Sequence, residues 1–407
     1  MRLIHYISAL LIVLSMQLTD FRISEIKIGD FFSTFLLLYF CINHKNVNIP
    51  VFYKKMYLCF CFFLISSFTV ILWTKFYPPN TNLSIFKQVG MISISRFIQL
   101  IGCLTFSLFI HNILIKHTVA FDDKFLKIID RLMLLFFFFF ILVFFMSFFQ
   151  IETLFVYGNH RLRGGFVEGG PFGLFAVFYY VYRTKMFKFS TIWTILIIIL
   201  LFASQSKAAV LFLIFIVIIY LILYNKLKIK NTIIAGFISF IILILLNNYW
   251  GFTNRLIAYW DTYKNIKYVV PTRVNDPSLV MGRIAAAYIA PEIIKNNILL
   301  GVGLGNYSLV RNNPEYLGIF PIVSEWDLMG FGGIINILIE VGIIGLFLFI
   351  LPFLKMWQLS KLKTTRFLII LFMIAQIFGV QTYFQYLWFV VGIMTAINMR
   401  HKNSILT

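Results

Sequence analysis

The sequence predicts an all-α, polytopic integral membrane protein of about 12 transmembrane helices, with one long outer loop between spans 9 and 10. Of its 407 residues, 61% are apolar and only 12% are charged, whereas a soluble domain carries roughly a quarter charged residues. Apolar runs of about 17–25 residues, each long enough to cross a bilayer, recur along the whole chain. These observations exclude a soluble enzyme. Their continuous apolar character also excludes an outer-membrane barrel, whose strands would alternate apolar and polar residues.

Hydropathy places the spans at intervals along the chain, with short polar connections between most of them. The first span lacks a small-x-small cleavage site, so we expect it to remain uncleaved. The chain, 1–407, is expected to form a single transmembrane domain, with residues 249–327 as the long outer loop within it. The predicted spans are residues 3–18, 28–43, 56–73, 94–115, 132–149, 168–182, 191–203, 208–224, 232–248, 329–354, 366–380 and 384–399.

The formal net charge of +20 follows the predicted topology. The loops on one side of the membrane are rich in Lys and Arg, and their only acidic residues are Asp122, Asp123 and Asp130. Because basic residues accumulate in short cytoplasmic loops, this side is predicted to be cytoplasmic and to carry both termini. The charge is therefore a topology signal, and nucleic acid is not predicted as a partner.

Three polar segments are predicted on the opposite, outer face. The first is residues 157–171, which include Arg161, Arg163 and Glu168. The second is the tight turn 204–207, which ends in a lysine. The third is the long outer loop, and loops longer than about 15 residues without their own structure are usually functional or disordered. Its Trp, Tyr and apolar residues favour an ordered lid or pocket.

Residues 281–294 of this loop predict a short amphipathic helix with Arg283 on its first turn. A glycine series follows it. Alternating glycines allow positive φ and close backbone approach, so their N–H groups are expected either to converge on an anion or to permit close packing. The expected apolar stripe of the helix is Ala286, Ala287, Ala290 and Ile294, and the glycines are Gly301, Gly303 and Gly305.

Two ionisable residues are predicted within spans. Glu340 lies in span 329–354, and an ionisable group at membrane depth is costly unless it is paired or hydrated. It is a candidate either for function or for a structural hydrogen bond that orients the span. Arg96 lies about one turn into the fourth span, where it would either extend to the lipid headgroups or line an outer anion site.

Motifs for a metal or a nucleophile are missing from the sequence. It contains no G-x-S-x-G, no H-E-x-x-H and no D-x-D pair that would hold a metal-bound nucleotide sugar. Its 6 histidines are scattered along the chain. The sequence therefore predicts no metal site and no cofactor.

Several motifs on the outer face carry a family resemblance. An Arg, a Gly-x-Phe, a polar residue and a Pro-containing turn occur in Arg161–Pro171, and a small polar turn follows at Ser204–Ala208, with lysine where arginine is commoner. Next come Arg283, the L-L-G-x-G-x-G-N-Y element at Leu299–Tyr307, and the E-x-G element at Glu340–Gly345. In this order these motifs resemble those of the bacterial O-antigen polymerase and O-antigen ligase superfamily. Its members are polytopic proteins that transfer lipid-linked glycans on the periplasmic side.

The resemblance implies an enzyme that takes a glycan from a polyprenyl diphosphate. Outside the cell a donor must carry its own leaving group, and arginine suits a departing diphosphate because its planar fork binds phosphate bidentately. The candidate diphosphate ligands are Arg161, Arg163, Lys207 and Arg283. The candidate catalytic carboxylates are Glu168 and Asp327. The supporting residues are Glu340, Arg96, Gly301, Gly303 and Gly305.

The favoured prediction is a metal-independent repeat-unit polymerase for O-antigen, capsule or another polysaccharide, in a bacterial plasma (inner) membrane. Ligases of the superfamily carry a His-Asn pair ahead of the E-x-G element, where this chain has Gly330 and Phe331. Ligase and flippase of lipid-linked oligosaccharide remain as alternatives. Expected partners are a polyprenyl-diphosphate-linked oligosaccharide, membrane lipids, a chain-length regulator and a flippase.

Overall fold

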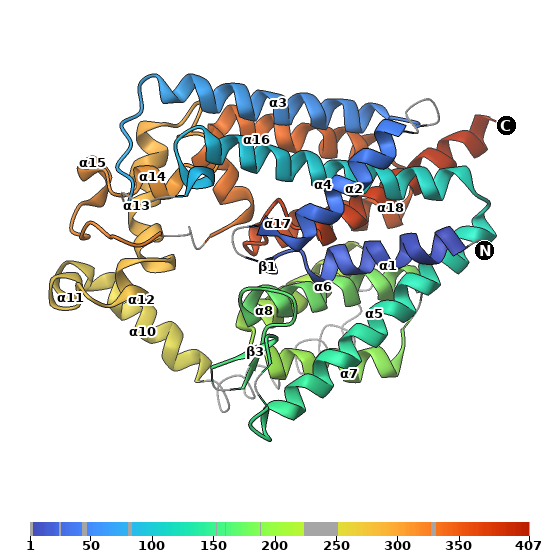
Figure 1. The fold of residues 1–407 in the computed structure, drawn as a ribbon, viewed down its shortest axis with the longest axis horizontal. Helices are drawn as coiled ribbons and strands as arrows, with labels where there is room; N and C mark the ends of the chain where they lie inside the picture. Colours follow the sequence, from blue (N-terminus) through green and yellow to red (C-terminus); the bar gives the residue numbers. More distant parts are fainter. Residues whose placement is uncertain are drawn as a thin grey trace.

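The chain folds into a bundle of long helices with a group of shorter helices at one end (Figure 1). This computed structural model describes residues 3–23, 26–42, 47–79, 84–151, 153–158, 160–187, 189–223, 251–326 and 331–406. Strands in these ranges form only two short antiparallel pairs. They are β1 (Arg22–Ile23) with β2 (Ile26–Lys27), and β3 (Val156–Tyr157) with β4 (Arg161–Leu162).

The long helices coincide with every predicted span except 232–248, which lies outside the described residues. The fifth helix begins 13 residues before its predicted range, and the last helix ends 7 residues after its predicted range. By length and composition, α3, α4, α5 and α16 can each cross a membrane. The structure thus supports an all-α membrane protein, while the number of 12 spans stays a prediction. The helices are α1 (Leu3–Gln17), α2 (Ile28–Ile42), α3 (Val51–Ile71), α4 (Met91–Lys116), α5 (Val119–Ser147), α6 (Gly169–Phe187), α7 (Thr191–Ser204), α8 (Lys207–Leu223), α16 (Gly333–Leu359), α17 (Lys363–Ile377) and α18 (Gln385–Leu406).

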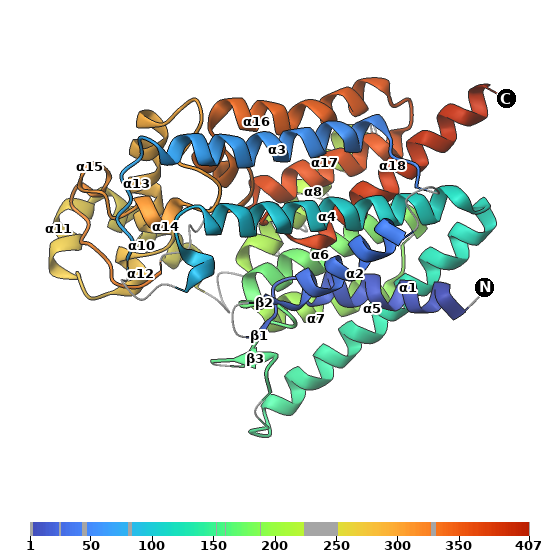
Figure 2. The same cartoon turned by 45° about the horizontal axis from the view of Figure 1, so that its top comes forward.

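Helix α18 lies at the centre of the bundle, in contact with α1, α4, α6 and α17. Its side chains from 385 to 396 are buried, and the indole N–H of Trp388 donates to the Thr382 carbonyl at 2.7 Å. Helices α3, α4 and α16 run side by side along one flank (Figure 2). The Trp388 indole can therefore be buried, because it contributes a large apolar contact area and its N–H has a hydrogen-bond acceptor.

Helix α1 begins and helix α18 ends at the same end of the bundle, and the short helices lie at the opposite end (Figure 1). This agrees with the expectation that both termini share one side of the membrane and that the long loop lies on the other. Which side is cytoplasmic stays a prediction from the charge pattern.

The long loop is helical over much of residues 251–326 and packs around a second hydrophobic core, to which Ile339 of α16 also contributes. Asp276 begins α12 by accepting hydrogen bonds from the Ser278 N–H and hydroxyl, and it also pairs with Arg273. These contacts lower the pKa of Asp276. The loop helices are α10 (Phe252–Lys264), α11 (Ile266–Thr272), α12 (Pro277–Val280), α13 (Arg283–Asn296), α14 (Tyr307–Val310) and α15 (Pro314–Leu317); a 3₁₀ turn, η2 (Ile85–Lys87), precedes α4.

Helix α13 confirms the predicted amphipathic helix but corrects its apolar stripe. Ala286 and Ala290 are buried as expected, whereas Ala287 and Ile294 are only half-buried. The larger side chains decide the orientation, because two isoleucines one turn apart face the loop core. The buried stripe is Ala285, Ala286, Ile289, Ala290 and Ile293.

Helix α16 is interrupted at Gly342, whose φ of 66° is not helical. The freed N–H of Ile343 donates to the Ile298 carbonyl at 2.8 Å, so the long loop supplies the hydrogen bond that the helix lacks. A broken helix at membrane depth is tolerated where protein re-satisfies its backbone. This break was not predicted from the sequence.

Candidate active site

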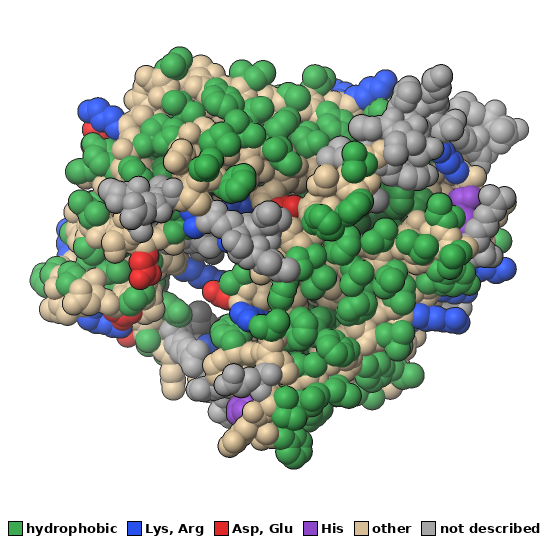
Figure 3. All heavy atoms as spheres, in the orientation of Figure 1, with side chains coloured by type: hydrophobic (Ala, Val, Ile, Leu, Met, Phe, Trp, Pro, Cys, Tyr) green, Lys and Arg blue, Asp and Glu red, His purple; other side chains and the backbone are tan. Residues whose placement is uncertain are grey.

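Two adjoining cavities lie where the loop helices face the bundle. The bundle cavity, about 460 Å³, is lined by residues of α6, α17, α18 and the first outer connection. The hairpin cavity, about 650 Å³, lies beside the β3–β4 hairpin and the turn between α7 and α8. Both are lined by Glu168, Gly170, Ala208 and Arg283. Figure 3 shows an opening at this place, with basic and acidic side chains on its rim.

Arg161 enters the hairpin cavity from β4. Its Nε donates to the Ser204 carbonyl at the end of α7 at 3.0 Å, and its guanidinium carbon lies 5.7 Å from the centre of the Tyr157 ring. Gly169 makes this approach possible, since a Cβ there would stand 2.6 Å from the Ser204 oxygen and 2.9 Å from the Arg161 Nε. One edge of the guanidinium is thus fixed by the protein beside the cavity.

Glu168 stands at the start of α6 with an exposed side chain on the wall of both cavities. Within the described chain its carboxylate has no hydrogen-bond or ion-pair partner. The backbone before it is held by Asp20, which accepts from the Val167 N–H at 3.4 Å and pairs with Lys27 at 2.7 Å. Asp20 and Lys27 are both buried. The protein therefore anchors the loop and leaves the Glu168 carboxylate open to the cavity.

Lys207 begins α8 after the tight turn and lines the hairpin cavity. Gln205 adopts the left-handed conformation that ends α7, and the Ser206 hydroxyl donates to the Gly170 carbonyl at 2.9 Å. Gly173 lets the turn pack tightly on α6, because a Cβ there would lie 2.8 Å from the Ser204 hydroxyl. The turn thus brings Lys207 to the same cavity as Arg161.

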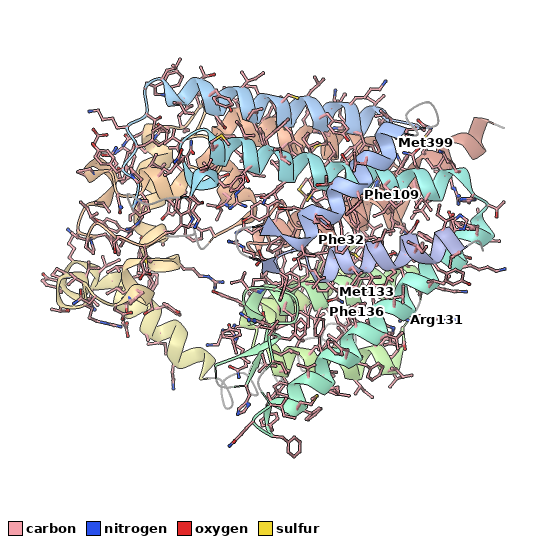
Figure 4. All side chains as sticks on the ribbon, viewed as in Figure 1. Phe32, Phe109, Arg131, Met133, Phe136 and Met399 are labelled. Carbon is pink, nitrogen blue, oxygen red and sulfur yellow. The ribbon has the colours of Figure 1, made fainter. Side chains whose placement is uncertain are left out.

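Arg283 is the first residue of α13 and reaches the site from the long loop. Its side chain is exposed, lines both cavities and has no hydrogen-bond or ion-pair partner in the described ranges. Nitrogen-bearing side chains project from the loop helices and from the bundle into the space between them (Figure 4). Arg161, Glu168, Lys207 and Arg283, which are far apart in the sequence, thus meet around one opening.

Two other candidates are not brought to this place. Arg163 donates through Nε to the Leu154 carbonyl at 2.9 Å and packs 5.6 Å from the Tyr157 ring. It lines neither cavity, so its contacts are those of a residue that closes the hairpin loop. Asp327 lies outside the described residues.

Glu340 and Arg96 belong to a separate buried cluster. The Gly305 N–H hydrogen-bonds the Glu340 carboxylate, and Arg96 lies near it in a small pocket of about 20 Å³. Arg96 also donates to Gln99 at 2.8 Å and lies 4.4 Å from the Tyr383 ring centre. Arg96 is thus held inside the protein, rather than extended towards headgroups.

The glycine series packs against the break in α16. Gly301, Gly303 and Gly305 all have positive φ. The Val302 and Gly303 N–H groups donate to the carbonyls of Ile339 and Glu340 at 3.1 and 2.7 Å. These N–H groups are already bonded within the protein, so the geometry follows the packing alternative rather than the anion alternative.

Three cavity residues were not among the sequence candidates. Asp20 and Arg22 enter the bundle cavity from the first outer connection, and Tyr386 enters it from α18. The Tyr386 hydroxyl is buried and has no hydrogen-bond partner among the described residues. The two charges of the short outer connection were a usable signal. A tyrosine inside an apolar span gives no such signal.

The site can hold an anion between fixed cations and present a carboxylate beside it. Arginine and lysine from three different segments surround the hairpin cavity, and an arginine fork matches phosphate geometry. Over the described part of the chain, no group of three His, Cys, Asp or Glu side chains is arranged to hold a metal ion.

Comparison with known proteins finds one family model that matches part of this chain. Residues 192–350 match the family model described as O-antigen ligase, a range that contains Lys207, Arg283 and Glu340. No curated protein and no solved structure matches the chain. The match confirms the resemblance to the O-antigen polymerase and ligase superfamily that the motifs predicted.

Proposed function

We propose that this protein is a polysaccharide repeat-unit polymerase on the outer face of the plasma membrane. It transfers a glycan from one polyprenyl diphosphate to the terminal sugar of another lipid-linked repeat. The observation that carries the proposal is the meeting of Arg161, Lys207 and Arg283 with Glu168 around two adjoining cavities. Two adjoining spaces suit a reaction between two lipid-linked substrates.

In the proposed reaction, the acceptor hydroxyl oxygen bonds to the anomeric carbon of the donor sugar. The bond from that carbon to the diphosphate oxygen breaks, and its electron pair leaves with the diphosphate. Arg161, Lys207 and Arg283 stabilise the charge that develops there, which is the kind of fixed electrostatic stabilisation that contributes most to such steps. Glu168 accepts the hydroxyl proton; Asp327, just before α16, is the second candidate for that role.

The apolar part of the hairpin cavity suits the polyprenyl chain. Phe144, Phe148 and Phe202 line it, and Phe148 and Phe202 are each 54% exposed. An apolar wall open to the hydrocarbon, next to fixed cations, matches a ligand with a prenyl tail and a diphosphate head. The proposed mechanism needs no metal and no cofactor. A chain-length regulator and a flippase are the proposed protein partners.

Ligase activity is the second candidate, because the matching family model is described as O-antigen ligase. The glycan profile of a deletion strain separates the candidates. A single repeat on the lipid core is the result expected for a polymerase. Accumulation of unattached lipid-linked polymer would establish a ligase, and loss of repeats from the periplasm would establish a flippase.

The outer location is tested by labelling. Asn265 in the long loop and Lys361 after α16 are both exposed and lie in regions predicted on opposite sides. Cysteine at position 265 should react with an impermeant maleimide in intact cells, and cysteine at position 361 only after permeabilisation. The reverse pattern would place the site in the cytoplasm and overturn the proposal.

A further inference from the structure

A cavity of about 660 Å³ lies at the end of the bundle that carries both termini, far from the candidate active site. It lies between the start of α3 and the ends of α16 and α18. Because α3 and α16 are both long and apolar enough to cross a membrane, their ends fall near the headgroup level of one leaflet. The charge pattern predicts that this is the cytoplasmic leaflet.

The polar part of the cavity is cationic. Lys55, Lys355, Lys361 and His401 line it beside the neutral Thr395 and Asn398, and no acidic side chain lines it within the described residues. Lys55 of α3 and Lys355 of α16 line the cavity together, so two positively charged side chains from different helices face one space. Two like charges repel, and neither ammonium has an acceptor to offer the other. An anion between them would receive hydrogen bonds from both and remove the repulsion.

The rest of the lining is apolar. Val51 and Phe52 line the cavity from α3, Pro352 and Met356 from α16, and Met399 from α18. An inorganic anion would use only the lysine end of this space. A ligand that fills both ends has a negatively charged head and a hydrocarbon part.

We propose that this cavity binds an anionic phospholipid, with the phosphate between Lys55 and Lys355 and the upper acyl chains against the apolar lining. Basic pockets between transmembrane helices on the cytoplasmic side are suited to such headgroups. The site would fix the inner-leaflet ends of α3, α16 and α18 relative to one another. It is independent of the proposed polymerase reaction.

Native mass spectrometry of the full-length protein in detergent tests the proposal. The protein is titrated in parallel with dioleoyl phosphatidylglycerol and dioleoyl phosphatidylcholine. We expect one phosphatidylglycerol to bind more tightly than phosphatidylcholine. Each lysine near the headgroup is worth about fivefold in affinity, so Lys55→Gln with Lys355→Gln should weaken phosphatidylglycerol binding about thirtyfold.

Matched variants separate this site from general surface charge. Lys54 and Lys363 are exposed neighbours that do not line the cavity, so Lys54→Gln with Lys363→Gln should leave binding unchanged. Val51→Trp keeps both cavity lysines and fills the apolar part, and it should also reduce phosphatidylglycerol binding. This variant tests the cavity independently of the lysine pair.

Three outcomes would overturn the proposal. They are equal binding of the two lipids, binding that survives the paired lysine substitutions, and displacement of phosphatidylglycerol by an equal concentration of inorganic phosphate. The last result would identify a simple phosphate site.

Discussion

The candidate active site and the glycine series that packs against α16 (Gly301, Gly303 and Gly305) both combine glycines with charged side chains, but their polar groups have different partners. Around the two cavities, glycines bring segments together, yet Glu168 and Arg283 remain exposed. At α16, the N–H groups of Val302 and Gly303 donate to backbone carbonyls, and Gly305 donates to the Glu340 carboxylate. Polar groups already satisfied within the protein stabilise the fold, whereas polar groups left open to a cavity are available to a ligand. The two regions should therefore respond differently to substitution.

The largest expected effect is at the arginines of the cavity. Arg161→Lys and Arg283→Lys each keep the charge but lose the planar fork, and such a change is not conservative at a bidentate site. Each should reduce long-chain glycan about 100-fold or more, which is the typical loss for one donor to a developing anion. Protein abundance should stay near wild type. Glycan ladders normalised to membrane protein level measure both.

Two further variants sharpen this result. Arg255 lies in the same loop outside the motifs, so Arg255→Lys should leave the glycan ladder nearly unchanged. The variant with both Arg161→Lys and Arg283→Lys should be much less than multiplicatively worse than either, because residues that serve one group act as a unit. A full-length ladder from either single variant would remove that arginine from the site.

At the break in α16, against which the glycine series packs, the expected loss is in stability. Gly342 has a φ of 66°, and a Cβ there would meet the Leu299 backbone. Gly342→Ala should therefore cost about 3 kcal/mol or more and lower the yield of folded protein. Gly158 also has positive φ but nothing within 4 Å of an added Cβ, so Gly158→Ala should cost only about 1 kcal/mol. Thermal unfolding in detergent compares them, and equal losses would contradict the packing role of Gly342.

A smaller effect is expected behind Arg161. A Cβ at Gly169 would press on the Arg161 Nε and the Ser204 carbonyl, whereas a Cβ at Gly170 would lie 3.9 Å from the guanidinium. Gly169→Ala should displace the arginine and reduce glycan synthesis about tenfold, because small misplacements of a binding group are costly. Gly170→Ala should be close to wild type. If both variants behave alike in the glycan ladder, the tight contact at Gly169 does not position Arg161.

The smallest effect is expected from removing metal ions. The proposed charge stabilisation comes from arginine and lysine, so synthesis by the purified protein should survive EDTA. Loss of activity that Mg²⁺ or Mn²⁺ restores would refute the arginine mechanism.

Much of the architecture could be predicted from the sequence, because a bilayer imposes long apolar runs and a basic cytoplasmic side. The outer polar segments were likewise visible as interruptions of those runs. Arg161, Glu168, Lys207 and Arg283 were named from motifs, and the structure places them around one opening.

The remaining features depend on contacts between distant residues. The break at Gly342 lies within one continuous apolar run, and its hydrogen-bond partner, Ile298, lies more than forty residues earlier. Arg163 looked equivalent to Arg161, but it lies just after β4, and its guanidinium bonds the Leu154 carbonyl instead of lining a cavity. Tyr386 lines a cavity only because α18 packs as it does. Local patterns do not encode such pairings.

The core of the long loop includes Ile339 of α16, so the loop and that helix share one hydrophobic cluster. Together with the backbone hydrogen bonds from Val302 and Gly303 to α16, this contact fixes the base of the loop to the bundle. A loop attached by a hinge could close on substrates of many sizes. A loop whose base is fixed to the bundle keeps the opening between them at a constant width. The choice of sugar would then depend on the fixed width of the opening and on the few side chains that narrow it.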